Sequence, residues 1–204
     1  MGPPYFLFRI ALLISFMSKE VDFNLISSED WNWTTGLFIA DGSKAKELRT
    51  FRTYFYLNSK KDSKILQKLE RILDSLNVRH FKQIKRRGTI YLRISCKQFY
   101  DAMPDKEKRF TPTNTEAFIA GFIDGDGYIT ERRGVLGFSQ TIVKWIGPFI
   151  ADYLEAKGIK SWKRLYYRNC FYYAASLKQI RSKTQIIRFM AGRQPTTTEA
   201  TSAI

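Results

Sequence analysis

The pattern of apolar and polar residues along the chain predicts two copies of one structural unit. One apolar helix is expected over 31–39 and a second over 118–123, and each runs into an Asp-Gly pair. Serine, threonine, asparagine and acidic residues precede both helices, and such residues cap the free N–H groups at a helix start. Before the second helix, Thr113 and Glu116 have the spacing of a capping box. We therefore expect two equivalent helices.

The same order of elements follows each helix. The first copy continues with a strand region at 48–57, an amphipathic helix at 63–76, strands at 79–85 and 89–95, and a helix from 97. The second continues with strands at 128–133 and 135–140, a helix at 142–156 with Pro148 as a kink, strands at 160–167 and 170–175, and a helix at 177–190. Each copy reads αββαββα, which predicts an α+β protein with two pseudo-symmetric repeats.

Composition shifts divide the chain into five parts. They are an apolar N-terminal extension at 1–26, the first repeat at 27–103, a polar linker at 104–112, the second repeat at 113–190 and a disordered tail at 191–204. The apolar run at 5–17 is too short to span a bilayer. We expect it to pack on the domain, and the alternative is that Met17 is the natural start.

The charge balance indicates a polyanionic partner. The chain has 34 Lys and Arg against 19 Asp and Glu, a formal net charge of +15. Nucleic acid is the first candidate partner and an anionic membrane surface the second. Two cysteines are too few for a disulfide framework, and a single histidine argues against histidine-based catalytic triads and metal sites.

Small residues recur on one face of both expected helices. Gly36 and Ala40 are four residues apart in the first, and Gly121 and Gly125 are four apart in the second. Residues at this spacing share a helix face, and small side chains there let two helix backbones approach closely. If the helices pack on these faces, their C-terminal ends meet.

This packing would bring two carboxylates together, Asp41 and Asp126, which stand at the same position of each copy. An anion at a helix C-terminus opposes the helix dipole by roughly 0.3–1 kcal/mol, and neighbouring carboxylates repel. Divalent cations would remove both penalties, and a site with only oxygen ligands suits Mg²⁺. Such a site can activate water for attack on a phosphodiester. Asp-Gly is also common turn chemistry, but its repetition at equivalent places favours a function.

Residues 34–42, TTGLFIADG, and 119–127, IAGFIDGDG, resemble the paired motif of LAGLIDADG homing endonucleases. The second copy is close to the consensus, and the first is degenerate, with Ile39 where an acid often stands. The resemblance covers about 27–190. It implies a compact, intron-encoded monomer with internal pseudo-twofold symmetry. The motif helices would pack at the interface between the halves, and two antiparallel sheets would form a saddle in the DNA major groove.

The activity implied by the resemblance is site-specific cleavage of double-stranded DNA, dependent on Mg²⁺ (or Mn²⁺), at a long site with 3′ overhangs. Asp41 and Asp126 would bind the metal, beside the backbone carbonyls of Ala40 and Gly125. Such sites also hold a polar or basic residue at the end of the second strand and a lysine near the last strand. The matching positions are Gln140, Lys60, Lys97 and Lys178. Asp124 is interpreted as structural.

Alternation along the strands predicts a sheet face that reads DNA. In the strand at 89–95, for example, Tyr91 and Arg93 face away from three apolar residues. Two-stranded ribbons can enter the major groove, where such side chains reach base edges. The strand candidates are Arg52, Tyr54, Tyr56, Asn58, Tyr91, Arg93, Arg132, Lys160, Arg164 and Tyr166. The hairpin-tip candidates for phosphate contact are Lys82, Lys85, Arg86, Arg87 and Arg168.

Three other functions compete with the nuclease. An intron maturase would bind intron RNA with the same fold, and a regulator would only bind DNA. A peripheral membrane protein ranks last, because no helix combines a basic face with a large apolar one. We expect an intracellular protein that lies with its host DNA, in a prokaryotic cytoplasm or nucleoid or in an organelle, with no membrane partner.

Overall fold

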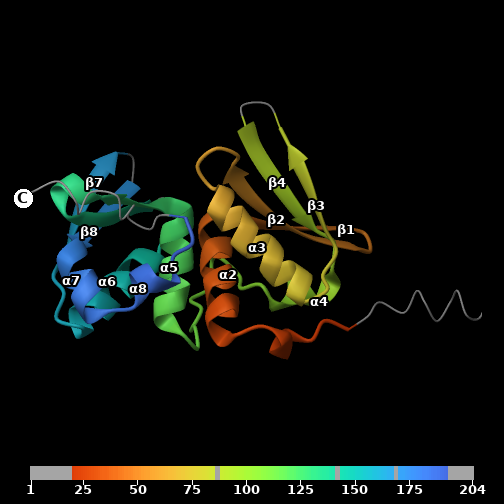
Figure 1. Cartoon of the computed structure of the whole chain (residues 1–204), viewed down its shortest axis with the longest axis horizontal. Coiled ribbons are helices and arrows are strands. Elements are labelled where there is room, and N and C mark those ends of the chain that lie inside the picture. The colour runs from red at the N-terminus through yellow and green to blue at the C-terminus, as the bar shows by residue number, and fades with distance from the viewer. Residues whose placement is uncertain (1–19, 86–87, 141–142, 168–169, 193–204) are drawn as a thin grey trace, which may run out of the picture.

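The computed structural model describes residues 20–85, 88–140, 143–167 and 170–192 (Figure 1). The first repeat comprises α2 (Ser28–Asp41), β1 (Gly42–Glu47), β2 (Thr50–Asn58), α3 (Ser63–Ser75), β3 (His80–Ile84), β4 (Thr89–Ile94) and α4 (Lys97–Ala102), after a short 3-10 turn, η1 (Phe23–Leu25). The second comprises α5 (Thr115–Asp126), β5 (Gly127–Thr130), η3 (Glu131–Arg133), β6 (Val135–Gln140), α6 (Ile146–Ala156), β7 (Ser161–Tyr167), β8 (Cys170–Ser176), α7 (Leu177–Lys183) and α8 (Ile186–Phe189).

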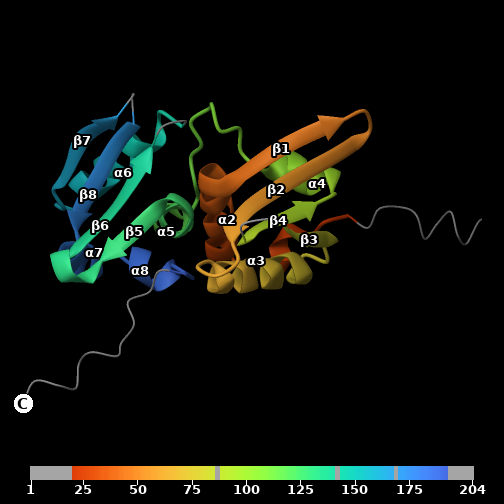
Figure 2. The ribbon, with the colours of Figure 1, turned by 90° about the horizontal axis from the view of Figure 1, so that it is seen from above.

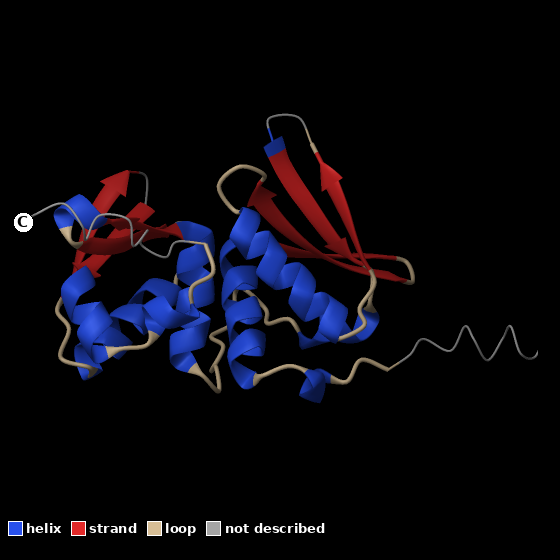
Figure 3. Cartoon of the chain, in the orientation of Figure 1, coloured by secondary structure: helices blue, strands red, loops and turns tan. Residues whose placement is uncertain are grey.

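The predicted α+β fold with two pseudo-symmetric αββαββα repeats is confirmed. Each repeat contains a four-stranded antiparallel sheet, in the orders β1-β2-β4-β3 and β5-β6-β8-β7. The helices α2 and α5 lie side by side where the halves meet, and the strands of both halves lie on the same side of the molecule (Figures 1 and 3). Figure 2 views the sheets from that side, over the helices.

Several expected boundaries change. The strand region at 48–57 is the second half of a hairpin, because β1 begins directly after Asp41 and the chain turns at Leu48, which has a positive φ of 51°. Pro148 produces no kink, since α6 begins at Ile146 and a proline in the first turn has no intrahelical partner to lose. The last helix is two helices, separated at the extended residue Thr184.

The described parts of both chain ends contact the repeats. In the N-terminal extension, the Val21 N–H donates to Gln98 Oε1 at 2.8 Å, and Phe23 packs on Trp31 with ring centroids 4.8 Å apart. This part of the extension therefore packs on the first repeat. Ala191 and Gly192, expected in the tail, are hydrogen-bonded to the second repeat. The apolar run at 5–17, including Met17, and residues 193–204 lie outside the described residues.

The predicted apolar stripe on α3 forms part of the core. Ile65, Leu69 and Ile72 of this helix are at most 1% exposed. They pack with strand residues such as Phe55 and Leu92 in one hydrophobic cluster that extends through both repeats. Burial of a large apolar side chain contributes about 1.5–3 kcal/mol, so these residues fix α3 beneath its sheet.

The paired helices approach as closely as backbones allow. A methyl group added at Gly36 would overlap the Phe118 carbonyl oxygen, and one added at Gly121 would overlap the Trp33 carbonyl oxygen. These two contacts are reciprocal, since the two glycines occupy equivalent positions of the repeats and so do their two partners. The seam is therefore a pseudo-twofold axis, and both glycines are required for it.

The start of the seam corrects the expected capping box. The N-cap of α5 is Asn114, whose side chain accepts from the Ala117 N–H at 3.0 Å. Thr113 instead meets its pseudo-symmetric counterpart, with 3.3 Å between the hydroxyls of Ser28 and Thr113. Thr113 also accepts a hydrogen bond from the buried side chain of Asn32 at 2.8 Å. The residue expected to cap α5 therefore joins the two repeats.

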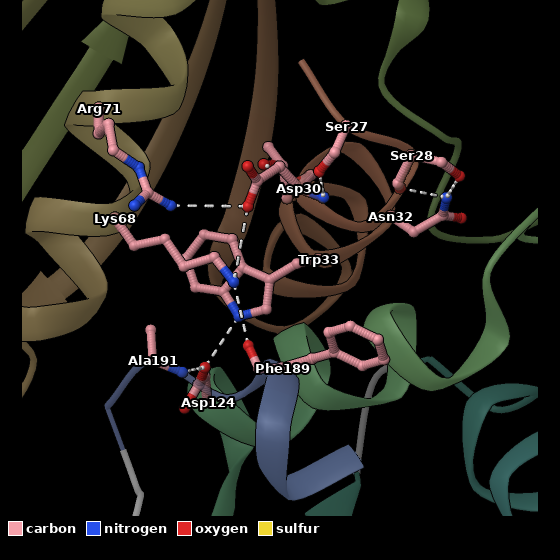
Figure 4. A network of polar contacts seen from close by, with 11 residues as sticks. Ser27, Ser28, Asp30, Asn32, Trp33, Lys68, Arg71, Asp124, Phe189 and Ala191 are labelled. Atoms are coloured by element: carbon pink, nitrogen blue, oxygen red, sulfur yellow. Dashed lines mark hydrogen bonds and ion pairs between the residues drawn. The ribbon is translucent and has the colours of Figure 1, made fainter. Parts of the chain in front are cut away.

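Asp124 has the structural role expected from the sequence. Its fully buried carboxylate accepts hydrogen bonds from Trp33 Nε1 at 2.8 Å and from the N–H groups of Ala191 at 2.6 Å and Gly192 at 3.0 Å (Figure 4). Burial raises the pKa of this carboxyl, while the three donors and the charge of Lys68 act in the opposite direction. Asp124 thus ties α5 to α2 and to the segment after α8.

Lys68 of α3 extends this network across the interface (Figure 4). Its ammonium lies 4.4 Å from the centre of the Trp33 ring and donates to the Phe189 carbonyl at 3.0 Å. The carboxylate of Asp30 is 3.8 Å from Lys68 and 3.7 Å from Arg71. The first repeat therefore holds the C-terminal helix of the second through one half-buried cation.

We expect Gly121→Ala to destabilise the protein by about 3 kcal/mol, because the added methyl overlaps a backbone carbonyl. Helix propensity alone would make the alanine variant more stable by about 1 kcal/mol, so a loss of stability identifies the close packing. Urea unfolding followed by circular dichroism measures the change. Gly134→Ala is the control, because nothing lies within 4 Å of that position and the only cost is its positive φ, about 1 kcal/mol.

We expect Asp124→Ala to lower the free energy of unfolding by about 3 kcal/mol, since it leaves one buried and two half-buried N–H donors without their acceptor. Asp101→Ala is the control, because Asp101 pairs with Lys97 on the surface of a helix, an interaction worth about 0.5 kcal/mol at most. Equal losses in the two variants, measured by urea unfolding, would contradict this role of Asp124.

Candidate active site and nucleic-acid interface

Asp41 and Asp126 are the last residues of α2 and α5, and a strand follows each directly. The next residues, Gly42 and Gly127, donate their N–H groups to carbonyls of the preceding turn while their backbones are extended. A side chain at Gly42 would overlap Phe38, so glycine permits the direct change from helix to strand. Each aspartate is therefore held between two rigid elements, without a loop.

The helix seam brings the two aspartates to the pseudo-twofold axis. Ala40 and Gly125 occupy equivalent positions of the two motif helices, and a methyl group at Gly125 would overlap the Ala40 methyl. The same added methyl would lie 3.0 Å from Asp41 Oδ2. The Asp41 carboxylate thus lies against the last turn of α5, one residue before Asp126. The predicted juxtaposition of the two helix ends is present.

A third charged group at this place was not predicted. Lys106, from the linker between the repeats, donates to the Ala40 carbonyl at 3.3 Å. Burial lowers the pKa of its ammonium, and the charges of Asp126 and Asp41 act in the opposite direction. Both aspartates are therefore close enough to interact with this lysine. The sequence offers no signal for it, since Lys106 is one of several charged residues in a polar linker.

The oxygen atoms at the helix ends fit a divalent cation. A lysine ammonium already lies against the Ala40 carbonyl, and although its burial lowers its pKa, the charges of both carboxylates attract a cation to this position. Within the described part of the chain, no group of three or more His, Cys, Asp or Glu side chains could hold a metal. A cation here would rely on Asp41, Asp126 and backbone carbonyls, and Mg²⁺ accepts such a set when water or phosphate oxygens complete it.

Gln140 and Lys60, expected at matching positions of the two repeats, do not stand at equivalent places in the two sheets. Phe55 pairs with Gly42 and Phe138 pairs with Gly127, so the counterpart of Gln140 is Leu57 rather than Lys60. Lys60 is exposed in the turn that follows β2. The side chain of Gln140 lies outside the described part. Gln140 is the last residue of β6, two residues beyond Phe138, the partner of the first residue of β5.

The structure does not bring Lys97 or Lys178 to the carboxylates. Lys97 pairs with Asp101 and lies 5.4 Å from the centre of the Phe51 ring. Phe51 is four residues from Phe55, about 13 Å along the strand from the end next to Asp41. Lys178 is exposed at the start of α7, which begins at the equivalent far end of the second sheet.

The outer face of the first sheet carries several of the expected DNA-contacting side chains. The core side of β2 and β4 is buried, and Tyr54, Tyr56, Tyr91 and Arg93 occupy the opposite face. The rings of Tyr54 and Tyr56 stack at 6.3 Å, and that of Tyr91 meets Tyr56 edge-on at 4.9 Å. Tyr56 also shares a 2.8 Å hydrogen bond with Ser43, two residues after Asp41. The aromatic cluster is therefore tied to the strand that follows Asp41 directly.

The position of Lys82 differs from the expected one. The sequence suggested a hairpin tip, but Lys82 pairs with Leu92 in the middle of β3, on the helix side of the sheet. Its ammonium is 2.9 Å from Glu70 of α3. The exposed side chain of Phe81 faces the outer side instead, where Arg93 lies 5.1 Å from the centre of its ring.

Other candidates of the first repeat have partners within the protein. Arg52 pairs with Glu47 at 2.8 Å on the outer face. The Asn58 side chain accepts from the N–H groups of Lys60 and Lys61, at 3.0 and 3.1 Å, and so stabilises the turn. Lys85 is exposed, 5.3 Å from the centre of the Tyr91 ring. Arg86 and Arg87 lie outside the described residues.

The outer face of the second sheet differs in detail. Tyr128 and Tyr172 stack at 5.6 Å, and the Tyr128 phenol lies directly over Gly137. Trp162 is 46% exposed on β7. These three aromatic residues were not predicted, although the strand alternation that identified Tyr54 and Tyr91 also applies to them.

The remaining basic candidates of this half lie at its edges or outside the described part. Arg132 is exposed in η3, and Lys160 is exposed just before β7. The side chains of Arg164 and Tyr166, and residue Arg168, are not among those the structure describes. None of the helices it does describe is long and apolar enough to cross a membrane.

Solved structures share this architecture. The complex of I-DmoI with DNA and Ca has a TM-score of 0.60 and 21% identity, over 76% of this chain and 86% of that chain. Mesophilic variants of the homing endonuclease I-DmoI give 0.61 and 20%, over 79% and 98%. The N-terminal LAGLIDADG domain of DUF199/WhiA gives 0.58 and 16%, over 88% and 89%.

No protein-family model and no curated protein sequence matches the chain. The resemblance therefore rests on the arrangement of the elements, including the two motif helices. The I-DmoI structures and the LAGLIDADG domain of DUF199/WhiA both match this arrangement. The chain has the LAGLIDADG fold, with both motif-bearing repeats in a single polypeptide.

Proposed function

We propose that this protein is a divalent-cation-dependent endonuclease that cuts double-stranded DNA at a long, specific site and leaves 3′ overhangs. The observation that carries the proposal is the pairing of Asp41 and Asp126 at the pseudo-twofold axis, next to the Ala40 carbonyl that accepts a hydrogen bond from the Lys106 ammonium. The strands of duplex DNA are themselves related by twofold axes. A pair of acids on such an axis suits one cut in each strand.

The roles of the residues follow from their positions. Asp41, Asp126 and the Ala40 carbonyl would hold the cation, with the Gly125 carbonyl as a further ligand. Bound there, Mg²⁺ or Mn²⁺ would acidify a water molecule and stabilise the charge on the phosphate. The seam between α2 and α5 fixes the two carboxylates relative to one another, so that little reorganisation is needed when DNA binds.

The sheets would supply recognition. Their outer faces lie on one side of the molecule (Figures 2 and 3) and carry the tyrosines and Arg93 described above. Arg93 is suited to base edges or phosphate, and Lys85 to phosphate. The net charge of +15 supports a polyanionic ligand. Because both repeats belong to one chain, we propose that a monomer suffices.

I-DmoI supports this proposal as a neighbour. Its solved structures include complexes with target DNA and with Mn, Ca and Mg. The proposal transfers only the general chemistry, a divalent cation and duplex DNA, to the residues of this chain.

Intron RNA is the second candidate ligand. The observation that favours it is the group of tyrosine rings on the outer sheet faces, since unpaired RNA bases stack on aromatic side chains. Competition between duplex DNA and structured RNA for the protein, measured by fluorescence anisotropy, separates the two. Preference for RNA with no cleavage of DNA would favour the maturase.

We expect Asp41→Asn and Asp126→Asn each to reduce double-strand cleavage at least about a thousandfold, because each removes a cation ligand. Incubation of a random-sequence duplex pool with the protein and Mg²⁺, followed by sequencing of the product ends, identifies the site and the overhang. Rates are then measured on the selected duplex. Asp152→Asn is the control, since it removes the same charge from an exposed aspartate of α6, outside the two motif helices. Unaltered cleavage by both seam variants would refute the assignment.

We expect Arg93→Ala to weaken duplex binding about 10- to 100-fold and to reduce the slope of log K against log salt by about one if its contact is to phosphate. Lys82→Ala is a matched control, because it removes the same charge from the opposite face of the same sheet. Fluorescence anisotropy over a salt series measures both. Equal effects of the two substitutions would mean that the outer face does not contact DNA.

A further inference from the structure

The linker places one lysine, Lys106, at the proposed cation site. Its Nζ is 3.3 Å from the Ala40 carbonyl oxygen, and its charge interacts with both Asp126 and Asp41. The other half-buried lysine near the linker, Lys44, donates instead to two carbonyls of the α4 region. Among the lysines of this region, Lys106 is thus distinguished by the oxygens that it contacts.

Both repeats hold Lys106 in place. Trp145, from the second repeat, donates its Nε1 hydrogen to the Lys106 carbonyl at 3.1 Å. Phe38, from the motif helix of the first repeat, has its ring centre 5.6 Å from the ammonium. The backbone of the residue is therefore anchored, and its side chain projects from this anchor toward the helix ends.

The ammonium and a divalent cation would compete for the same oxygens. The Ala40 carbonyl already accepts a hydrogen bond from Lys106, and the two carboxylates attract both cations. Two like charges within a few ångströms repel, and low-dielectric surroundings strengthen the repulsion. A divalent cation can bind fully only when the ammonium moves away from these oxygens.

We propose that Lys106 is a positioning residue that acts as the resident counter-cation of the carboxylate pair and weakens divalent-cation binding to the DNA-free protein. The inference rests on the proposed function. A phosphate of a bound duplex is the group that would draw the ammonium away, since it is anionic and would lie above the same helix ends. Binding of DNA and binding of the cation would then favour one another.

The test is the affinity of the DNA-free, full-length protein for Mn²⁺, measured from the electron paramagnetic resonance signal of free Mn²⁺. Lys106→Met removes the charge and keeps most of the apolar stem, and we expect it to bind Mn²⁺ about tenfold more tightly than the wild type. Lys106→Gln is a second neutral variant with the same expectation, should the methionine variant not fold. Lys106→Arg retains the charge and should bind like the wild type.

Lys108→Met is the matched control. Lys108 is exposed in the same linker, 3.8 Å from Asp105, and the substitution changes the net charge equally. Unchanged or weaker Mn²⁺ binding in the neutral Lys106 variants would overturn the proposal, as would an equal gain in Lys108→Met. A lysine with only a structural role would give no gain in affinity.

The result is separable from that of the cleavage experiment. Tighter Mn²⁺ binding by the neutral Lys106 variants, without any DNA cleavage by the wild type, would support Lys106 as counter-cation and refute the proposed nuclease function. Loss of cleavage in Asp41→Asn and Asp126→Asn, together with unchanged Mn²⁺ binding in Lys106→Met, would retain the nuclease and remove the role of Lys106.

Discussion

The close approach of the α2 and α5 backbones is the constraint on which the rest of the structure depends. Gly36 and Gly121 each admit a carbonyl of the opposite helix, so the helices cannot slide or rotate without a clash. Because a strand follows each motif aspartate directly, the same seam fixes the positions of both sheets. The packing of α2 against α5 therefore sets both the spacing of the two carboxylates and the separation of the two sheets.

Single residues break the pseudo-symmetry, and they connect the halves. Asp124 stands where the first repeat has Ile39, and it binds Trp33 of the first repeat and the segment after α8 of the second. Lys68 crosses the interface near the same tryptophan. Lys106 contacts the helix ends from the linker. Two identical repeats could pack around the same axis without these residues. The three charged side chains add contacts that fix the segment after α8 and the linker relative to the motif helices.

Local periodicity explains what the sequence could predict. The stripe of Ile65, Leu69 and Ile72 identifies a buried helix face, and the repeated Asp-Gly ends identify Asp41 and Asp126. Both signals are contained within short segments, and the Asp-Gly signal is reinforced by its recurrence at the same place in the second repeat. The order of elements and the pairing of the motif helices follow from them.

The failures involve information that no short segment contains. The basic hairpin predicts that Lys82 lies at a tip and contacts phosphate, but its register with Leu92 turns it toward Glu70. Lys97 is close to the last strand in sequence, yet strand length carries it away from Asp41. Thr113 has the spacing of a cap, but a buried asparagine of the other repeat binds it. Lys106 depends on the path of the linker, which polar composition leaves open.

The two outer faces differ enough to determine the kind of target that the proposed nuclease would read. The first sheet presents Tyr54, Tyr56, Tyr91 and Arg93, whereas the second presents Tyr128 over Gly137 and a stacked Tyr172. A palindromic site offers the same groups to both halves, and only identical faces could bind the two half-sites equally. Faces with different donors and shapes select different half-sites. A pseudo-symmetric scaffold with these two surfaces thus suits a DNA sequence that lacks twofold symmetry, while the paired aspartates of the proposed nuclease would still serve both strands.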